Sequence, residues 1–349
     1  MTRIFDAHCD TVLRIASDGI DLSRRLDEGH VDVPRLLGGG VGCQVFACYG
    51  TRAEHGDGIA AHADRLMGLV AGLEALPEVV VPRSGRELEA LAEQADRVGI
   101  LLAVEGGEAI DGQIDRLDTF RERGVCYVTL AWNDNELTGS SFGGGGGLTS
   151  LGADVARGME ERGILVDVSH MSDQAFADTA RIATRPFIAS HSSCRALCDI
   201  SRNVTDDQIR VIAERGGVIG VMFAPGVLDD GFRQAEFRLA APLHEEAKAH
   251  PERIVEILER MKSIMADEPR PGLDAIVDHL EHLAEIGGID CVALGSDFDG
   301  VPYLPAGLAS CEALPALVER MLARGFTGDQ VERICWDNWA RVFGAVLDG

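Results

Sequence analysis

The amino-acid sequence predicts an α/β fold, a (β/α)8 barrel of the TIM type, on two observations. Short apolar runs bounded by glycine or proline recur along the 349 residues, and most are continuously hydrophobic rather than alternating. That pattern is typical of parallel strands covered on both faces. Segments with helical periodicity separate the runs, as parallel strands require. An open, doubly wound sheet is the alternative, but eight strand–helix units in a chain of this length favour a barrel.

Eight apolar runs are the predicted strands. They are Arg3–His8, Val41–Cys48, Gly99–Glu105, Val125–Ala131, Gly163–Ser169, Pro186–Ser190, Gly217–Phe223 and Cys291–Ser296. The predicted helices between them are Asp57–Leu76, Ser84–Val98, Asp111–Arg123, Thr149–Arg162, Ser172–Ile182 and Thr205–Arg215. Several of these helices begin at Ser, Thr or Asp and end near Gly, which are the residues that cap helices.

Residues 1–349 are predicted to form a single barrel domain with one insertion. Residues 239–268, before the last predicted strand, form a long, charged stretch with helical character. We expect this inserted helical segment to pack outside the barrel or against a partner subunit. The glycine-bounded spacing elsewhere leaves no linker that would divide the chain into two domains.

The composition restricts the partners and the compartment. The 57 acidic and 32 basic residues give a formal net charge of −25, which repels phosphate backbones and anionic lipid. We therefore expect no nucleic-acid partner and no membrane partner. Nine cysteines without a Cys-x-x-Cys pair argue against a disulfide framework and favour a reducing compartment. With no signal-peptide pattern and no apolar run of about 20 residues, we expect a cytoplasmic protein.

Histidines and carboxylates follow five of the eight predicted strands. They are His8 with Asp10, Glu105, His170, His191, and Asp297 with Asp299. Because the carboxyl ends of barrel strands meet at one mouth, these side chains are expected to lie close together. Three imidazoles and several buried carboxylates are not satisfied there without a cation. Nitrogen and oxygen ligands, a bridging carboxylate and a spare carboxylate as base are the components of a two-metal hydrolytic site.

Each of these residues alone has a structural alternative. His191 can be a hydrogen-bonded strand-end histidine, Glu105 a surface loop residue and Asp297 part of an acidic turn. A metal site explains all of them together, whereas the structural alternative needs a separate reason at each of five strands. The two lysines of the chain, Lys248 and Lys262, both lie in the inserted segment, so Glu105 is the natural bridge between two ions.

In this order, the motifs resemble those of the renal-type (membrane) dipeptidase family within the amidohydrolase superfamily. The likeness spans nearly the whole chain. The matching stretches are Asp6-Ala7-His8-Cys9-Asp10, Val104-Glu105-Gly106-Gly107, Val166-Asp167-Val168-Ser169-His170, Ser190-His191-Ser192-Ser193, Ser201-Arg202-Asn203-Val204, Gly295-Ser296-Asp297-Phe298-Asp299-Gly300 and Asp337-Asn338 to Phe343.

The resemblance implies two zinc ions as cofactors. His8 and Asp10 would hold one ion, and His170 and His191 the other. Glu105 and a water or hydroxide would bridge the pair. The hydroxide would attack the peptide carbonyl, since metal binding lowers the pKa of water towards ~7.

The resemblance also implies roles in proton transfer and substrate binding. Asp297 would be the catalytic acid–base group, and Arg202 would bind the free carboxylate of the substrate with its planar fork of donors. Better-known family members carry a histidine in a Thr-Leu-Thr-His pattern, where this chain has Thr129-Leu130-Ala131-Trp132. Trp132 can donate a hydrogen bond but cannot titrate. Either Trp132, Asn133 or Asn135 contacts the substrate carbonyl, or the substrate preference differs.

The sequence thus predicts a zinc-dependent dipeptidase, with L-Xaa-D-Xaa dipeptides among its candidate substrates. One alternative is an amidohydrolase-type hydrolase of another carboxylate-bearing amide or a lactone, and another is a non-catalytic metal-binding barrel. Arg202 distinguishes the dipeptidase from a hydrolase whose substrate lacks a carboxylate, because such a substrate has no use for this side chain. The resemblance and the inserted segment also suggest a homodimer.

Overall fold

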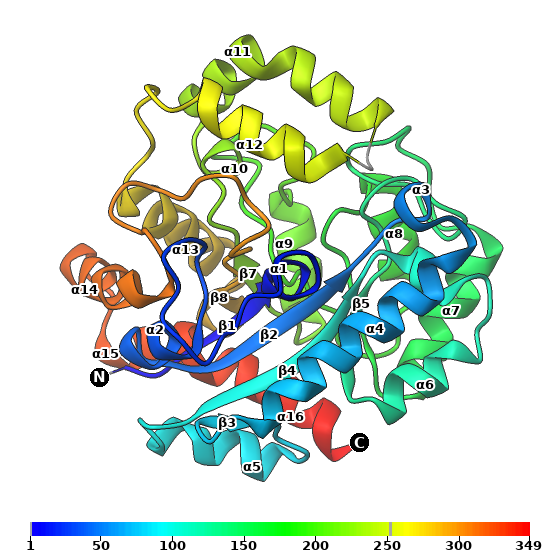
Figure 1. Cartoon of the computed structure of the whole chain (residues 1–349), viewed down its shortest axis with the longest axis horizontal. Coiled ribbons are helices and arrows are strands. Elements are labelled where there is room, and N and C mark those ends of the chain that lie inside the picture. The colour runs from blue at the N-terminus through cyan, green and yellow to red at the C-terminus, as the bar shows by residue number, and fades with distance from the viewer. Residues whose placement is uncertain (1, 251–252) are drawn as a thin grey trace.

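The computed structural model describes residues 2–250 and 253–349, which form a barrel of parallel strands surrounded by helices (Figure 1). The strands are β1 (Ile4–Cys9), β2 (Val41–Tyr49), β3 (Val79–Val80), β4 (Val98–Glu105), β5 (Val125–Thr129), β6 (Leu165–Asp167), β7 (Ile219–Val221) and β8 (Val292–Leu294). They are parallel and adjoin in the order β6, β5, β4, β2, β1, β8 and β7. The two-residue strand β3, which the sequence did not predict, pairs with the start of β4.

The predicted strand at Pro186–Ser190 closes the barrel through isolated bridges instead of a continuous ladder. Ile188 bridges Asp167 of β6, and Ala189 bridges Ile219 of β7, both in parallel. The chain passes very close here, since a Cβ atom at Gly220 would meet the Ser190 carbonyl oxygen at 2.2 Å. Eight segments therefore form the wall of the barrel, and the TIM-type fold predicted from the sequence is confirmed.

The helices follow the strands as the alternation of the sequence predicted. The helices before the insertion are α1 (Thr11–Asp18), α2 (Val33–Gly38), α3 (Arg52–His55), α4 (Ile59–Gly72), α5 (Gly85–Ala90), α6 (Arg116–Glu122), α7 (Ser150–Glu161), α8 (Asp173–Ile182), α9 (Asp206–Glu214) and α10 (Pro225–Leu228). Thr149, Ser172 and Thr205 cap three of them, each accepting a hydrogen bond from a backbone N–H of the first turn. The helix expected over Ser84–Val98 ends at Ala90, before a short 3-10 turn.

The inserted segment consists of two helices rather than one. Helix α11 (Asp230–Ala249) begins nine residues before the predicted start, and α12 (Ile254–Ile264) follows it. They lie side by side at the top of Figure 1, and Leu243 of α11 shares an apolar cluster with Met261 of α12. Helix α13 (Leu273–Gly287) then returns the chain to β8. Within the described part of the chain, no helix has the length and apolarity that crossing a membrane requires.

The last helices of the chain are α14 (Leu314–Arg324), α15 (Gly328–Glu332) and α16 (Asn338–Asp348). Helix α16 and the π-helical turn before it, Arg333–Asp337, close the end of the barrel where the strands begin. The Phe5 ring at the start of β1 packs on the rings of Trp336 and Phe343, 5.7 and 5.1 Å away between centroids. Apolar packing therefore fills this end, whereas the other end, where the strands finish, carries the buried polar side chains. All nine cysteines are buried with free thiols.

Candidate active site

The structure brings together side chains that follow five different barrel segments. His8 lies in β1, Glu105 ends β4, and His170 follows β6. His191 follows the segment that closes the barrel, and Asp297 follows β8. These residues and Asp10 are all buried. Ligand atoms lie within 4.8 Å of one another in three groups, namely His8 with Asp10 and Glu105, Glu105 with His170 and His191, and His8 with His191 and Asp297.

The Glu105 carboxylate lies between the histidines. Its Oε2 atom is 3.5 Å from His8 Nε2. Its Oε1 atom is 3.2 Å from His170 Nε2 and 3.4 Å from His191 Nε2. One oxygen therefore faces the imidazole from β1, and the other faces the imidazoles of His170 and His191. This is how a carboxylate must lie to contact two cations at once.

Several buried atoms at the mouth lack hydrogen-bond partners among the described residues. They include His8 Nε2 and Asp10 Oδ1. In addition, His170 Nε2 and His191 Nε2 lie only 3.0 Å apart. Buried polar atoms without partners cost free energy, of the order of 1–3 kcal/mol each. A divalent cation would satisfy them, and nitrogen with carboxylate oxygen is a donor set that fits zinc.

The carboxylates of the site lack sufficient positive charge from the protein itself. Burial lowers the pKa of His8, but the nearby Glu105, Asp10 and Asp297 carboxylates outweigh it and raise this pKa to about 10. Burial raises the pKa of Asp297 to about 6, with His8 opposing the shift and Glu105 adding to it. A cation held by these carboxylates would take the place of the proton that they hold on His8.

The other two histidines are in the form that binds metals. Burial, followed by the positive charge of Arg202, lowers the pKa of His170 to about 4. Burial, His8 and Arg202 lower the pKa of His191 well below its usual value. Both imidazoles are therefore neutral at physiological pH, and a neutral imidazole nitrogen is a metal ligand.

The backbone at the site is held in uncommon conformations. His170 and Asp297 have φ angles of 65° and 62°, in the left-handed region that residues other than glycine rarely adopt. Such backbone strain collects at functional sites. Gly300 allows two carboxylates to come close, because a Cβ atom there would meet Asp10 Oδ2 at 2.1 Å and Asp297 Oδ1 at 2.2 Å.

Arg202 is buried at the edge of the histidine cluster. Its Nη1 donates a hydrogen bond to Ser192 Oγ at 2.8 Å, and its Nη2 donates to the His191 carbonyl at 2.7 Å. Its Nε is buried without a partner among the described residues. Burial lowers the pKa of Arg202 to about 10, so the guanidinium stays charged at neutral pH.

The segment after β5 places an aromatic side chain beside His170. The half-buried Trp132 ring lies 6.2 Å from the His170 ring and packs edge-on against Tyr49 at 5.1 Å. Asn133 is also half-buried next to it. Asn135 instead donates to the Leu130 carbonyl and accepts from backbone N–H groups of its own loop, so its amide supports the loop.

Asp299, which the sequence grouped with Asp297, does not join the cluster. Its carboxylate accepts hydrogen bonds from Thr11 Oγ1 at 2.6 Å and from the His30 N–H at 2.8 Å. Its φ angle of 64° helps to direct it there, and its own N–H donates to His30 Nδ1. Asp299 therefore fixes the loop after β8, and His30, which had no predicted role, assists it.

Three residues in direct or indirect contact with the histidines were missed by the sequence analysis. Tyr127 contacts His8, and Ser190 joins His191 to Asp167. Asp167 did carry a signal, because it is a carboxylate inside an otherwise apolar predicted strand. Tyr127 in the middle of β5 carried none.

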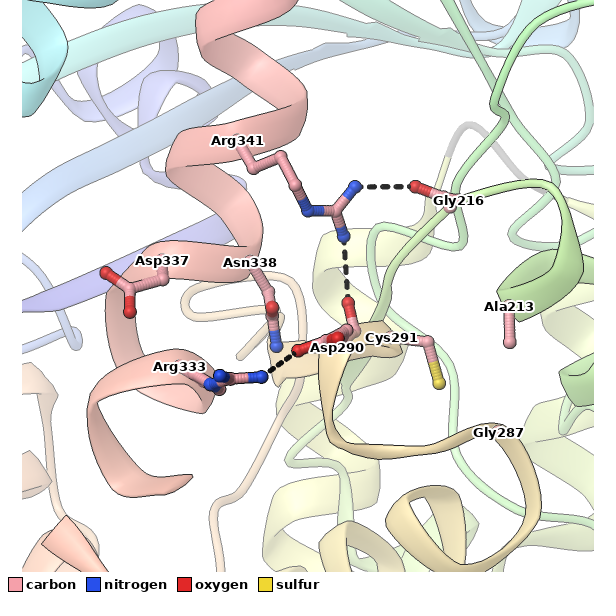
Figure 2. A pocket seen from close by; sticks show the side chains of 10 residues that line it. Ala213, Gly216, Gly287, Asp290, Cys291, Arg333, Asp337, Asn338 and Arg341 are labelled. Atoms are coloured by element: carbon pink, nitrogen blue, oxygen red, sulfur yellow. Dashed lines mark hydrogen bonds and ion pairs between the residues drawn. The ribbon is translucent and has the colours of Figure 1, made fainter. Parts of the chain in front are cut away.

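A cavity of about 560 Å³ lies at the opposite end of the strands, before β7 and β8 and beside α16 (Figure 2). Arg341 donates hydrogen bonds to the carbonyls of Gly216 and Asp290, and Arg333 pairs with the Asp290 carboxylate at 2.5 Å. None of the buried unpartnered atoms of the described residues belongs to its lining. Its arginines join three segments of the fold, and the cavity carries none of the chemistry found at the mouth.

The fold and the polar mouth define a metal-dependent hydrolase of the (β/α)8 class. Comparison with known families agrees with the sequence resemblance. The chain belongs to the membrane dipeptidase family, peptidase family M19, whose model matches residues 1–348. It is therefore a metal-dependent peptide hydrolase, as the sequence predicted.

Individual relatives resemble the chain over most of its length. An uncharacterized protein in the pqqA 5′ region of Klebsiella pneumoniae is 35% identical over 256 residues, which are 71% of this chain and 82% of that protein. The crystal structure of a metallo peptidase named dipeptidase AC superposes with a TM-score of 0.83 at 25% identity, over 100% and 99% of the two chains. A metallo peptidase from Rhodobacter sphaeroides, liganded with a phosphinate mimic of the dipeptide L-Ala-D-Ala, has a TM-score of 0.80 at 25% identity, over 98% of each chain.

Proposed function

We propose that the chain is a dipeptidase that holds two zinc ions and hydrolyses dipeptides, including those of the L-Xaa-D-Xaa type. The position of Glu105 supports this proposal most strongly. Its Oε2 atom faces His8 and its Oε1 atom faces His170 and His191, at 3.2–3.5 Å. A site for a single ion would not need a carboxylate whose two oxygens face different histidines.

His8 and Asp10 would hold one ion, His170 and His191 the other, and Glu105 both. When bound, the ions would supply a Lewis acid for the peptide carbonyl and would activate water at neutral pH. The three histidines are buried, so their rings cannot turn freely away from the ligand positions.

Asp297 is the proposed acid–base group. Its Oδ1 atom lies 3.9 Å from His8 Nε2, within the cluster of ligand atoms. With a pKa of about 6, the carboxylate is ionised at neutral pH yet can accept a proton. It would take the proton of the attacking water and return it to the leaving amine.

Arg202 is the proposed binding group for the C-terminal carboxylate of the substrate. Its Nη atoms are fixed by His191 and Ser192, so the charge is oriented before the substrate arrives. A guanidinium recognises a carboxylate by charge-assisted hydrogen bonds. The relative from Rhodobacter sphaeroides was crystallised with a dipeptide mimic, which supports a substrate of this size.

Trp132 and Asn133 are proposed to contact the substrate near the bond that is cleaved. The Trp132 indole lies beside His170 and can donate one hydrogen bond. Because tryptophan cannot titrate, this contact would orient the carbonyl without exchanging protons. Because Trp132 lies where better-known family members carry a histidine, a second candidate function is the hydrolysis of another carboxylate-bearing amide or of a lactone.

Metal analysis together with a substrate panel tests the proposal. The panel contains L,L- and L,D-dipeptides, N-acyl amino acids and lactones. We expect two zinc ions per chain, turnover of dipeptides, loss of turnover on chelation and recovery with zinc. Metal binding without turnover across the panel would show a non-catalytic barrel. Turnover of lactones that is unchanged in Arg202→Ala would show the second candidate function.

We also propose a homodimer in a reducing, cytoplasmic environment. The exposed apolar side chains Phe237 and Leu239 of α11 and Ile264 of α12 support an interface on the inserted segment. The buried free thiols support a reducing compartment. Light scattering is expected to show a dimer that Phe237→Glu dissociates. Cell fractionation and titration of nine thiols in denatured protein check the compartment, and a monomer or a secreted, oxidised protein would contradict these proposals.

A further inference from the structure

We infer that Tyr127 and the pair Ser190–Asp167 are positioning residues, each of which fixes the tautomer of one metal-binding histidine. Tyr127 acts on His8, and Ser190 with Asp167 acts on His191. The inference rests on the proposed metal site and adds to it the groups that make each Nε2 atom a ligand.

The Tyr127 hydroxyl has one proton, and the Ser190 side chain, the Ala7 carbonyl and His8 Nδ1 all lie within hydrogen-bond reach of it. Its oxygen lies 2.8 Å from the Ala7 carbonyl oxygen and 2.8 Å from His8 Nδ1. A carbonyl oxygen can only accept, so two acceptors would face each other unless the hydroxyl donates to Ala7. His8 Nδ1 must then carry a proton and donate it to the Tyr127 oxygen. When a cation takes the place of the other proton of the ring, it meets the lone pair of Nε2, which is the atom nearest to Glu105, Asp10 and Asp297.

Ser190 orients His191 as Tyr127 orients His8. Its Oγ atom lies 2.6 Å from Asp167 Oδ2 and 2.7 Å from His191 Nδ1. The Asp167 carboxylate also accepts from Thr129 Oγ1 and from the N–H groups of Ser169 and Ser190, so four donors fill its lone pairs. Because a carboxylate oxygen can only accept, the Ser190 proton goes to Asp167, and His191 Nδ1–H donates to Ser190. The His191 lone pair on Nε2 faces Glu105 Oε1.

His170 has no such support. Its Nδ1 atom is buried without a hydrogen-bond partner among the described residues. Its ring is held instead by the left-handed backbone and by Phe142, which packs edge-on at 5.6 Å. Each proposed ion therefore has one histidine that is oriented by a hydroxyl, namely His8 for the first ion and His191 for the second. Loss of one hydroxyl is expected to weaken one ion and not the other.

Zinc titration of the metal-free, full-length protein against a competing chelator tests this selectivity. We expect Tyr127→Phe to weaken one of two zinc equivalents and Ser190→Ala to weaken one, each by about 10- to 100-fold. The double variant is expected to weaken both equivalents. Tyr303→Phe and Ser193→Ala are the matched controls, since they remove buried hydroxyls that bond to Glu236 and to the Met222 carbonyl. Both controls are expected to bind zinc as the wild type does.

Wild-type protein provides a second readout that does not depend on the folding of a variant. In nitrogen-15 NMR of the zinc-loaded protein, we expect His8 and His191 to show protonated Nδ1 and zinc-shifted Nε2 atoms. Zinc on Nδ1, or single variants that leave both affinities unchanged or weaken both equally, would overturn the inference while the two-zinc site stands. A wild-type chain that binds fewer than two zinc ions would instead overturn the proposed function.

Discussion

The two ends of the barrel differ in how their buried polar groups are satisfied. At the mouth, His8, Asp10, His170 and Arg202 each keep a buried atom without a partner among the described residues. At the opposite end, where the strands begin and which we call the closed end, arginines line a cavity of about 560 Å³. Their donors bind backbone carbonyls and the Asp290 carboxylate. The volume of a cavity therefore does not identify the site in this protein. The site is identified instead by the buried polar atoms that the fold leaves without hydrogen-bond partners.

Unsatisfied buried polar atoms indicate a site because leaving them without a partner costs free energy. Native structures satisfy the large majority of buried polar groups, so a cluster of exceptions indicates a ligand or a function. The strained backbone of His170 and Asp297 adds a second cost at the same place. At the closed end, Arg341 instead contributes to stability by joining α16 to the segments before β7 and β8.

The largest effect is expected at the proposed bridge. In Glu105→Gln, zinc stoichiometry is expected to fall below two and kcat/KM to fall by about 10³-fold or more, because loss of one partner from a buried ionic cluster costs about 3–5 kcal/mol. Metal analysis and dipeptide kinetics measure both quantities. Asp290→Asn at the closed end is the matched control and should keep both values. Two tightly held ions in Glu105→Gln would exclude the bridging role.

The next effect separates metal binding from proton transfer. Asp297→Asn is expected to retain both zinc ions but to lower kcat by ~10²-fold or more, as loss of a general acid–base group does. Metal content and the pH dependence of kcat are measured on the same preparation. Retained activity with an unchanged pH profile would remove Asp297 from the mechanism.

A smaller effect is expected at the substrate carboxylate. Arg202→Ala is expected to lower kcat/KM for dipeptides by about 10- to 10²-fold, since a hydrogen bond to a charged group contributes about 1.5–3 kcal/mol. The corresponding dipeptide amides lack the carboxylate and should show little change. Equal losses for dipeptides and their amides would contradict the proposed role.

The smallest effect is expected at the closed end. The side chains of Arg333 and Asp290 are 48% and 71% exposed, and exposed ion pairs contribute about 0–1 kcal/mol. Arg333→Gln should therefore leave kcat/KM within about twofold and shift the urea midpoint only slightly. A loss of activity comparable to that of Arg202→Ala would show that the two ends are coupled and would break the contrast between them.

The fold was predictable where the pattern is local. Buried parallel strands produce continuous apolar runs, so seven of the eight barrel segments were predicted as strands with errors only at their ends, and the eighth, Pro186–Ser190, forms isolated bridges. The interruption at Pro186–Ser190 depends on how closely Gly220 approaches another segment, which no single run reveals. The early start of α11 was missed because the helix begins at the polar pair Asp229 and Asp230, a pattern typical of a loop, and the sequence alone does not show that Asp229 is its N-cap.

The residues of the site likewise include some that the sequence predicts and others that it does not. His8 and Glu105 combine ligand chemistry with a position at a strand end, and both features are visible in the sequence. The contact between Tyr127 and His8 depends on how strands far apart in the sequence meet, and a mid-strand tyrosine carries no sign of it. The direction of Asp299 was also beyond prediction, because a left-handed φ angle turns its carboxylate towards His30.

Anomalous diffraction from crystals of the zinc-loaded protein is the most direct measurement of the proposed site. Two zinc peaks are predicted, one beside His8 and Asp10 and one beside His170 and His191, with Glu105 in contact with both. No peak is predicted in the cavity at the closed end. A single peak, or zinc that does not touch Glu105, would contradict the two-metal site.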